Sequence, residues 1–282
     1  MKYSCIGGQA VMEGIMMKNG DKYAVAVRKP DNEIEIKVDE CHSFIKNKKI
    51  LTLPLIRGMF NFVDSLVLGM KSLMYSAEFF MEDEEEEEKE RVKREKKGKK
   101  EKTEKQKDSE NSLLLGLTVA FSLVLSVAIF MILPYFISQL FQKLTDSHLL
   151  ISIAEGAVRI TIFMAYIVLI SRMKDIQRTF MYHGAEHKCI NCIEHGMDLT
   201  VENVRKSSRL HKRCGTSFLL IVMVVSIVMF LFIRISSPVW RVVVRLLLLP
   251  VVAGISYEFI RLAGRSENKF VGLLSKPGMA MQ

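Results

Sequence analysis

The chain has 282 residues, of which 49% are hydrophobic and 25% are charged, and its mean hydropathy is positive. These values argue against an ordinary soluble enzyme and indicate an integral membrane protein. The formal net charge of +9 does not indicate nucleic-acid binding, because basic residues on a cytoplasmic face are what membrane orientation and anionic lipids require.

Residues 1–52 are predicted to form a small cytoplasmic element that contains β-structure. The stretch "YAVAVRKPDNEIEIKVDE" alternates apolar and polar residues on both sides of a Pro-Asp-Asn turn, which is typical of a β-hairpin. The preceding stretch "CIGGQAVMEGIMMKNG" is rich in glycine, and it lacks the uninterrupted apolar run of a signal peptide. Its lone carboxylate, Glu13, is either a turn residue that accepts backbone hydrogen bonds, or an extra metal ligand or a support for a metal-ligating histidine.

Residues 53–81 are predicted to form an amphipathic or partly inserted helix. Its charged residues recur every seven positions and therefore form one narrow stripe on an otherwise apolar helix; they are Arg57, Asp64, Lys71 and Glu78. Such a helix lies in the membrane interface or packs its stripe on something polar, because a full span would place four charges in hydrocarbon.

Residues 82–112 are predicted to be a charged linker that is disordered or a frayed helix. Twelve acidic and eleven basic residues lie between Glu82 and Asp108, with almost no apolar side chains among them. Such a composition buries too little surface to offset the entropy of ordering the chain.

Residues 113–282 are predicted to be a membrane domain with four spans, since each of four apolar stretches has about the 20 residues that a transmembrane helix requires. The stretches are roughly 112–141, 149–170, 216–233 and 239–262. Eleven Lys or Arg residues in 82–112 and nine in 172–213 predict that the N-terminus, the loop 172–215 and the C-terminus are cytoplasmic. In the second stretch, Glu155 and Arg159 are four residues apart and form either a helix pair or a polar cavity.

The cytoplasmic loop 172–215 concentrates metal-ligating residue types. Four of the six histidines and three of the five cysteines lie between His183 and Cys214. Within "YHGAEHKC", the pattern H-x-x-E-H is the one found in inverse zincins. On a helix, His183 and His187 would share one face and one Zn²⁺, and Glu186 beside them is a candidate general acid/base.

Three interpretations of this loop stay open. In the first, His183 and His187 bind a metal together with His211 or Cys214, and a position is left for water. In the second, the C-x-x-C pair Cys189 and Cys192 joins Cys214 and a histidine in a closed structural site. In the third, the histidines hydrogen-bond to phospholipid phosphates.

Several motifs, spread over nearly the whole chain, carry a family resemblance. They are "GGQAVMEGIMM" (7–17), Arg57-Gly58, "YHGAEHK" (182–188), "TVENVR" (200–205), "HKRCGTSF" (211–218) and "YEFIRLAG" (257–264). Together they resemble the YqhQ-like bacterial membrane proteins, a family whose function is unknown. The resemblance implies a multi-spanning protein of the bacterial inner membrane, and it identifies as motif residues His183, Glu186, His187, His211, Cys214, Glu13 and Arg57. Similar proteins continue past the "KPG" region with a polar tail, whereas this chain stops at Gln282.

We therefore expect a mainly α-helical integral membrane protein with about four transmembrane helices, an amphipathic helix and a small N-terminal β-hairpin element. The leading hypothesis is a zinc-dependent hydrolase that acts on a peptide or lipid-derived substrate at the cytoplasmic membrane face. Glu186 is the predicted catalytic residue, and the predicted metal ligands are His183, His187, His211 and Cys214. Glu13, Arg57 and Glu258 are predicted to support the ligands or to contact substrate. The alternatives are a non-catalytic assembly or regulatory protein with a structural metal, and a transporter that uses Glu155 and Arg159.

Overall fold

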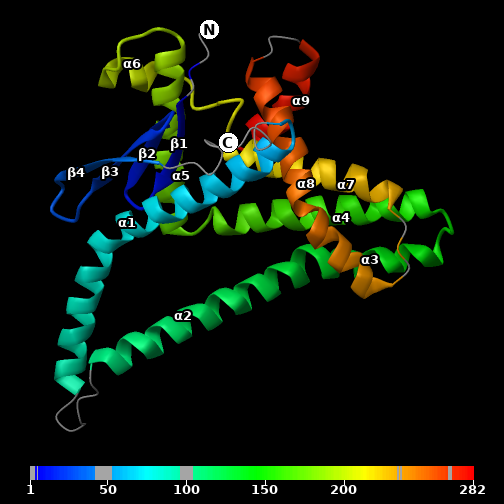
Figure 1. The fold of residues 1–282 in the computed structure, drawn as a ribbon, viewed down its shortest axis with the longest axis horizontal. Helices are drawn as coiled ribbons and strands as arrows, with labels where there is room; N and C mark the ends of the chain where they lie inside the picture. The colour runs from blue at the N-terminus through cyan, green and yellow to red at the C-terminus, as the bar shows by residue number, and fades with distance from the viewer. Residues whose placement is uncertain are drawn as a thin grey trace. The chain divides into compact units, whose positions relative to one another are not determined.

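The computed structural model describes residues 4, 6–41, 53–95, 104–233, 235, 237–265 and 269–282. Four strands come first and helices follow (Figure 1). The strands are β1 (Ile6–Val11), β2 (Gly14–Asn19), β3 (Lys22–Arg28) and β4 (Ile34–Glu40). The helices are α1 (Ile56–Glu95), α2 (Glu104–Val127), α3 (Leu133–Gln139), α4 (His148–Ile170), α5 (Lys174–Glu194), α6 (Val201–Lys206), α7 (Gly215–Phe232), α8 (Pro238–Arg265) and α9 (Lys269–Ala280). A π-helical turn (Ala128–Ile132) precedes α3, and a 3-10 turn (Leu140–Lys143) follows it.

The contacts of the chain divide it into two compact units. The first contains Met1–Met81, Ile170–Val228 and Arg245–Gln282, and the second contains Glu82–Leu169 and Met229–Val244. The candidate site described below lies wholly within the first unit.

The N-terminal element is a four-stranded antiparallel meander in the order β1-β2-β3-β4. Its last two strands are the predicted hairpin, and residues 29–33 connect them. Strands β1 and β2 were not predicted from the sequence, because the glycines in this segment lower its strand propensity. The remainder of the predicted element, residues 42–52, lies outside the described residues.

One face of this sheet packs against α1. Val11, Met16, Val25 and Val27 form its buried core together with Leu68 of α1. The backbone N–H of Met12 also donates a hydrogen bond to Ser76 Oγ at 3.1 Å. The sheet is therefore closed by the side of α1 that carries Leu68 and Ser76, next to the charged stripe.

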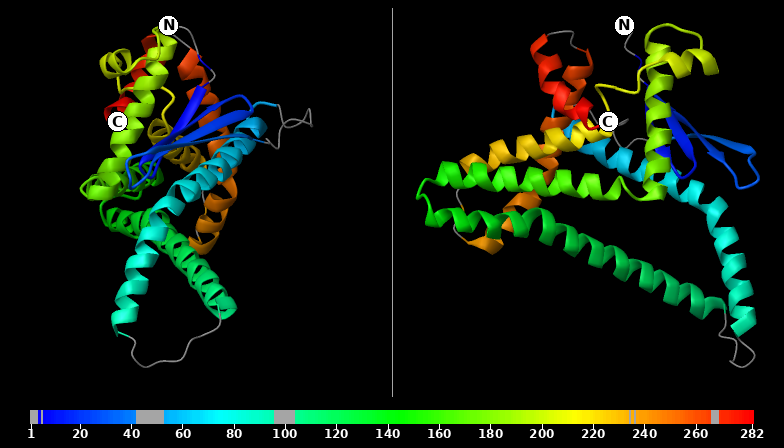
Figure 2. Two further views of the ribbon diagram at one scale, coloured as in Figure 1. Left: turned by 90° about the vertical axis from the view of Figure 1, so that its left-hand side faces the viewer. Right: turned by 180° about the vertical axis from the view of Figure 1, so that it is seen from behind.

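The opposite face of the sheet packs against α5, so the sheet lies between two helices (Figure 2). Successive residues of a strand point to opposite faces. Gln9 accordingly contacts Gly69 of α1, and Gly8 contacts Glu186 of α5. This arrangement brings the sheet directly onto the helix that carries the H-x-x-E-H pattern.

All four predicted spans are confirmed as helices that are long and apolar enough to cross a membrane. They cover Gly116–Lys143, His148–Ile170, Gly215–Phe232 and Val239–Gly264. In the second of these, Arg159 Nη2 donates to Glu155 Oε1 at 2.9 Å, and both side chains are buried. This contact is the helix pair that the four-residue spacing allows.

The segment 82–112, predicted to be disordered or a frayed helix, contains helical residues. The chain is helical over 82–95, at the end of α1, and over 104–112, at the start of α2. Glu, Lys and Arg have high intrinsic helix propensities, so a charged segment without a core can still continue a helix that begins elsewhere. Residues 96–103 lie outside the described residues.

Candidate metal centre

Helix α5 carries three of the predicted site residues. His183, Glu186 and His187 lie three and four positions apart, so one face of the helix presents all of them. The two imidazole centroids are 4.3 Å apart. Glu186 and His187 are only 3% and 2% exposed, whereas the side chain of His183 is 25% exposed. His183 is therefore the member through which the group can be reached from outside.

The segment 208–210, which follows α6, returns to α5. Its three consecutive backbone carbonyls contact side chains of that helix. The Asn191 side-chain amide donates to the carbonyls of Ser208 (2.7 Å) and Leu210 (3.0 Å). Between them, the carbonyl of Arg209 lies 2.6 Å from His187 Nδ1. A carbonyl oxygen only accepts hydrogen bonds, so Nδ1 carries the proton and Nε2 keeps its lone pair. This contact leaves His187 in the tautomer that ligates through Nε2.

Cys214 completes the group from the start of α7. Its Sγ lies 3.0 Å from His183 Nε2. One ligand atom each of His183, His187 and Cys214 lies within 4.8 Å of the other two, and this is the group of three potential ligands found in the described part of the chain. The thiol also receives the backbone N–H of Thr216 at 3.4 Å, as a side chain at a helix N-terminus does. Two histidines and one cysteine are donors that suit zinc.

Glu186 is enclosed by the sheet. A Cβ on Gly8 would lie 2.5 Å from Glu186 Oε1, so only a glycine leaves room for the carboxylate. Glu186 Oε2 is 3.6 Å from His183 Nδ1 and 3.5 Å from His187 Nε2, and it has no hydrogen-bond partner among the described residues. Burial raises the pKa of Glu186 to about 7, and the charge of Arg213 opposes this shift only in part. A buried carboxylate oxygen without a hydrogen bond, beside three potential ligands, fits a site that receives a cation or a water molecule.

Burial also keeps the three potential ligands uncharged. It lowers the pKa of His183 to about 4, with a further contribution from His187, and it lowers the pKa of His187. Burial raises the pKa of the Cys214 thiol, although the hydrogen bonds from Thr216 oppose that change. Neutral imidazoles are the form in which histidine binds a metal, whereas the thiol must lose its proton.

His211 lies next to this group but is engaged elsewhere. Its ring centroid is 5.8 Å from that of His187, and its Nε2 lies 3.4 Å from Glu194 Oε2. Arg213 forms an ion pair with the same carboxylate, and Ser4 donates two hydrogen bonds to it. The backbone of His211 exchanges two hydrogen bonds of 2.8 Å with the amide of Gln282. The sequence predicted either His211 or Cys214 as the third ligand. The structure brings Cys214 to His183 and His187.

The residues predicted to support the ligands or substrate form separate pairs. Glu13 lies in the turn between β1 and β2 with a φ of 48°, and its carboxylate binds Arg178 and the Tyr182 hydroxyl of α5. Arg57 of α1 donates to Glu258 of α8, at 2.6 Å from its Nε. Glu13 thus fixes the hairpin turn to the helix just before His183, and the other pair ties α1 to α8.

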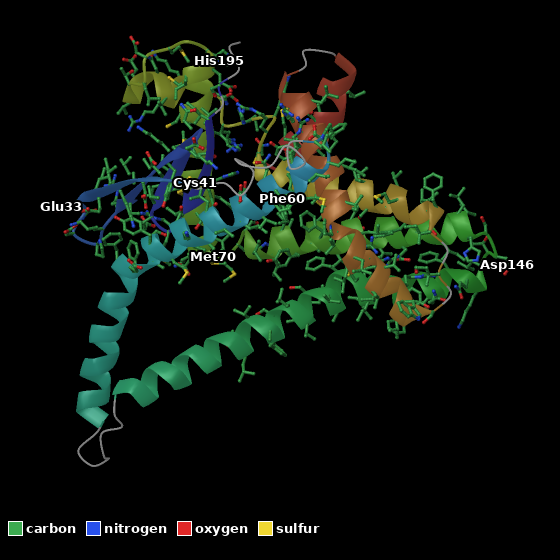
Figure 3. All side chains as sticks on the ribbon, in the orientation of Figure 1. Glu33, Cys41, Phe60, Met70, Asp146 and His195 are labelled. Atoms are coloured by element: carbon green, nitrogen blue, oxygen red, sulfur yellow. The ribbon has the colours of Figure 1, made fainter. Side chains whose placement is uncertain are left out.

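Cys189 and Cys192, the C-x-x-C pair of the closed-site interpretation, lie outside the group of three converging ligands. Cys192 is fully buried, and its Sγ lies 3.4 Å from the carbonyl oxygen of Asp198. His195 caps the end of α5, where its Nδ1 lies 2.7 Å from the carbonyl of Asn191 (Figure 3). Within the described residues, neither Cys189 nor Cys192 shares a group of three potential ligands with Cys214.

Sequence reasoning missed two residues that build the site, Gly8 and Asn191. Asn191 follows His187 by four residues, so helical spacing alone places both on one face and could have indicated a shared role. Gly8 carries no comparable signal, because its contact with Glu186 depends on how the sheet docks onto α5.

The comparisons with known proteins agree with the sequence motifs. A family model described as "Protein of unknown function (DUF1385)" matches residues 53–282. The uncharacterized protein YqhQ of Bacillus subtilis (strain 168) is 34% identical over 281 residues, which cover 98% of this chain and 84% of that protein. No solved structure matches the chain. The chain belongs to this family of unknown function.

Proposed function

We propose that this member of the family is a membrane-anchored, zinc-dependent hydrolase of the bacterial inner membrane, with its centre facing the cytoplasm. The observation that carries the proposal is the convergence of His183, His187 and Cys214 to within 4.8 Å beside a buried carboxylate oxygen that lacks a hydrogen bond. Three protein ligands with one position left open are typical of catalytic rather than structural zinc sites.

The residues present fit a zinc ion by chemistry as well as by distance. The Arg209 carbonyl fixes the proton of His187 on Nδ1, which is the contact that orients a ligating histidine. The N-terminus of α7 and the Thr216 N–H offset part of the effect of burial, which raises the pKa of the Cys214 thiol, and a bound zinc ion would favour the thiolate. When bound, a zinc ion would act as a Lewis acid on the scissile carbonyl or phosphoryl group.

Glu186 supplies the proton transfer in this proposal. In this proposal its carboxylate accepts a proton from the attacking water and returns it to the leaving group. The sheet limits the movement of the carboxylate, because Gly8 touches its Oε1 side. The free Oε2 faces the two histidines, at 3.6 and 3.5 Å.

A structural metal in a non-catalytic assembly or regulatory protein is the second candidate. The observation that favours it is burial: Cys214, Glu186 and His187 are each at most 3% exposed. Only the partly exposed His183 then offers access to a substrate.

The two candidates differ in the role of Glu186, and a conservative variant separates them. Cells that produce the wild type, Glu186→Gln or Glu202→Gln would be compared by mass spectrometry of their membrane lipids and peptides, and zinc would be measured in each purified protein. Glu202 is an exposed glutamate of α6 and serves as the matched control.

The hydrolase proposal predicts that Glu186→Gln retains its zinc but loses the products that accumulate with the wild type, whereas Glu202→Gln behaves as the wild type. Identical extracts from all three strains, with zinc present in each protein, would contradict catalysis and favour the structural metal.

A further inference from the structure

An apolar groove of about 410 Å³ lies between α1, α7 and α8 in the first unit. Every side chain that lines it is apolar, and representatives from the three helices are Phe60, Val63, Phe218, Val222, Pro250 and Ala253. Figure 3 shows Phe60 where α1 passes the other two helices. The volume falls within the range of about 300–1,000 Å³ that is usual for ligand pockets.

The groove lies next to a close approach of α1 and α8. A Cβ on Gly58 would lie 2.9 Å from the carbonyl oxygen of Gly254, so the two backbones are in contact there. The lining residues Phe62 and Pro250 lie about one helical turn beyond that contact. At this level α7 contributes the third wall, and the rings of Phe62 and Phe218 pack at 5.5 Å.

The same face of α7 connects the groove to the metal centre. The carbonyl of Cys214 accepts the backbone N–H of Phe218, so the helical geometry already includes Cys214. Phe218 and Val222 follow Cys214 by four and eight residues and therefore lie on its side of the helix. With a rise of 1.5 Å per residue, the groove starts roughly 6 Å from the Cys214 backbone.

We propose that this groove holds one hydrocarbon chain of a membrane lipid and that the chain positions the polar part of the same molecule at His183, His187 and Cys214. The second half of this inference rests on the proposed hydrolase function. It narrows the substrate class from peptide or lipid-derived to an amphiphile whose scissile ester, amide or phosphoester bond lies close to the start of its apolar chain.

Two observations favour a lipid chain over other occupants. Helices α7 and α8, which form two walls, are among the four helices that could cross a membrane, so hydrocarbon is the medium expected around them. A polar occupant would leave its own groups without partners, since no polar side chain lines the groove. At its α1 edge the groove includes Val63, which also belongs to the exposed apolar side of that helix. A lipid chain can therefore enter sideways.

The experiment uses the full chain in vesicles of phosphatidylethanolamine and phosphatidylglycerol. The probe is a phosphatidylethanolamine with a diazirine in the middle of one acyl chain, and cross-linked residues are identified by mass spectrometry after irradiation and digestion. Val222→Trp fills the groove, and Val224→Trp adds the same side chain at an exposed position of the same helix. Zinc is measured in every sample.

We expect cross-links at Met59–Val63 and Phe218–Val222 in the wild type. We expect them to fall at least fivefold in Val222→Trp and to change less than twofold in Val224→Trp, with zinc unchanged in both. Where Val222→Trp fails to fold, Leu249→Trp fills the groove from α8 and gives the same test.

Equal labelling of the groove in the two tryptophan variants would overturn the inference. The inference would also be overturned if the lipid probe cross-linked to no groove residue in a wild type that binds zinc. That result would leave the proposed hydrolase function unaffected. Specific groove labelling in a protein without zinc would instead support the lipid site and contradict the proposed function.

Discussion

At the scale of single residues, the centre depends on backbone groups as much as on ligands. The carbonyl of Arg209 sets the tautomer of His187, and the Asn191 amide holds the carbonyls on either side of it. These contacts fix the return of the chain toward Cys214. The H-x-x-E-H spacing predicts that His183, Glu186 and His187 share a helix face, but local spacing carries no information about this returning segment.

Replacement of Asn191 should therefore loosen the site without removing a ligand. In Asn191→Ala, the backbone carbonyls of Ser208 and Leu210 lose their donor, and we expect a loss of stability of about 1–3 kcal/mol from the two hydrogen bonds. We also expect weaker zinc binding, because the carbonyl that orients His187 is no longer held in place. Thermal unfolding and zinc titration of the purified protein measure both effects. Unchanged zinc affinity together with lowered stability would show that Asn191 has a structural role only.

Gly8 and Gly7 offer a matched pair of substitutions on one strand. Gly8→Ala would place a methyl group 2.5 Å from Glu186 Oε1, whereas Gly7→Ala would meet nothing within 4 Å. We expect Gly8→Ala to displace the carboxylate or the strand at a cost of about 1–3 kcal/mol, as overpacked positions do. Gly7→Ala should unfold at nearly the wild-type temperature. Equal melting temperatures for the two variants would mean that β1 does not press on Glu186.

At the scale of elements, α1 carries apolar residues on both its buried and its exposed side. Leu68, Tyr75 and Phe79 pack on the core of the sheet, and the small residues Gly69 and Ser76 let the strands approach the helix closely. Its exposed side carries large apolar residues: Val63, Leu66, Val67, Met70 and Met74. The seven-residue spacing of charges predicts an apolar helix with one polar stripe, and the structure adds that a neighbouring side is the one that the sheet covers.

An apolar helix side that is exposed on a membrane protein should contact lipid. The chain has a single tryptophan, Trp240, so a Trp240→Phe background allows one reporter to be introduced at a time. We expect brominated acyl chains to quench the fluorescence of Met70→Trp strongly. They should leave Glu33→Trp, in the exposed turn between β3 and β4, nearly unquenched. Equal quenching at both positions would contradict an interfacial position of α1. Figure 3 shows Met70 on the side of the helix away from the sheet.

Predictability differed among the elements for physical reasons. Long apolar runs have one stable outcome in a bilayer, so all four spans were predicted to within a few residues of the helices that form. Strands β1 and β2 were not predicted, since their glycines weaken the local signal and the pairing with β3 is what stabilises them. For the charged segment, composition left disorder and a frayed helix open, and its described parts are helical because Glu, Lys and Arg favour helix even without a core.

At the scale of the whole molecule, the distribution of basic residues predicts the orientation in the membrane. Eleven Lys or Arg residues in 82–112 and nine in 172–213 predict a cytoplasmic position for the sheet and the candidate metal centre. The short connection around Asp146 should then lie outside. Asp146→Cys should react with a membrane-impermeant maleimide in intact cells, whereas the wild type should react only after the membrane is disrupted. Labelling of the wild type in intact cells would contradict this prediction and indicate the opposite orientation.

The central claim is that two histidines and one cysteine bind zinc, and zinc X-ray absorption spectroscopy of the purified full-length protein tests it most directly. The account predicts about one zinc ion per chain, with one sulfur ligand at about 2.3 Å and nitrogen or oxygen ligands at about 2.0–2.1 Å. Cys214→Ser should remove the sulfur contribution. Protein purified without chelators that contains no zinc would contradict the account, and so would two or more sulfur ligands, which would direct attention to Cys189 and Cys192.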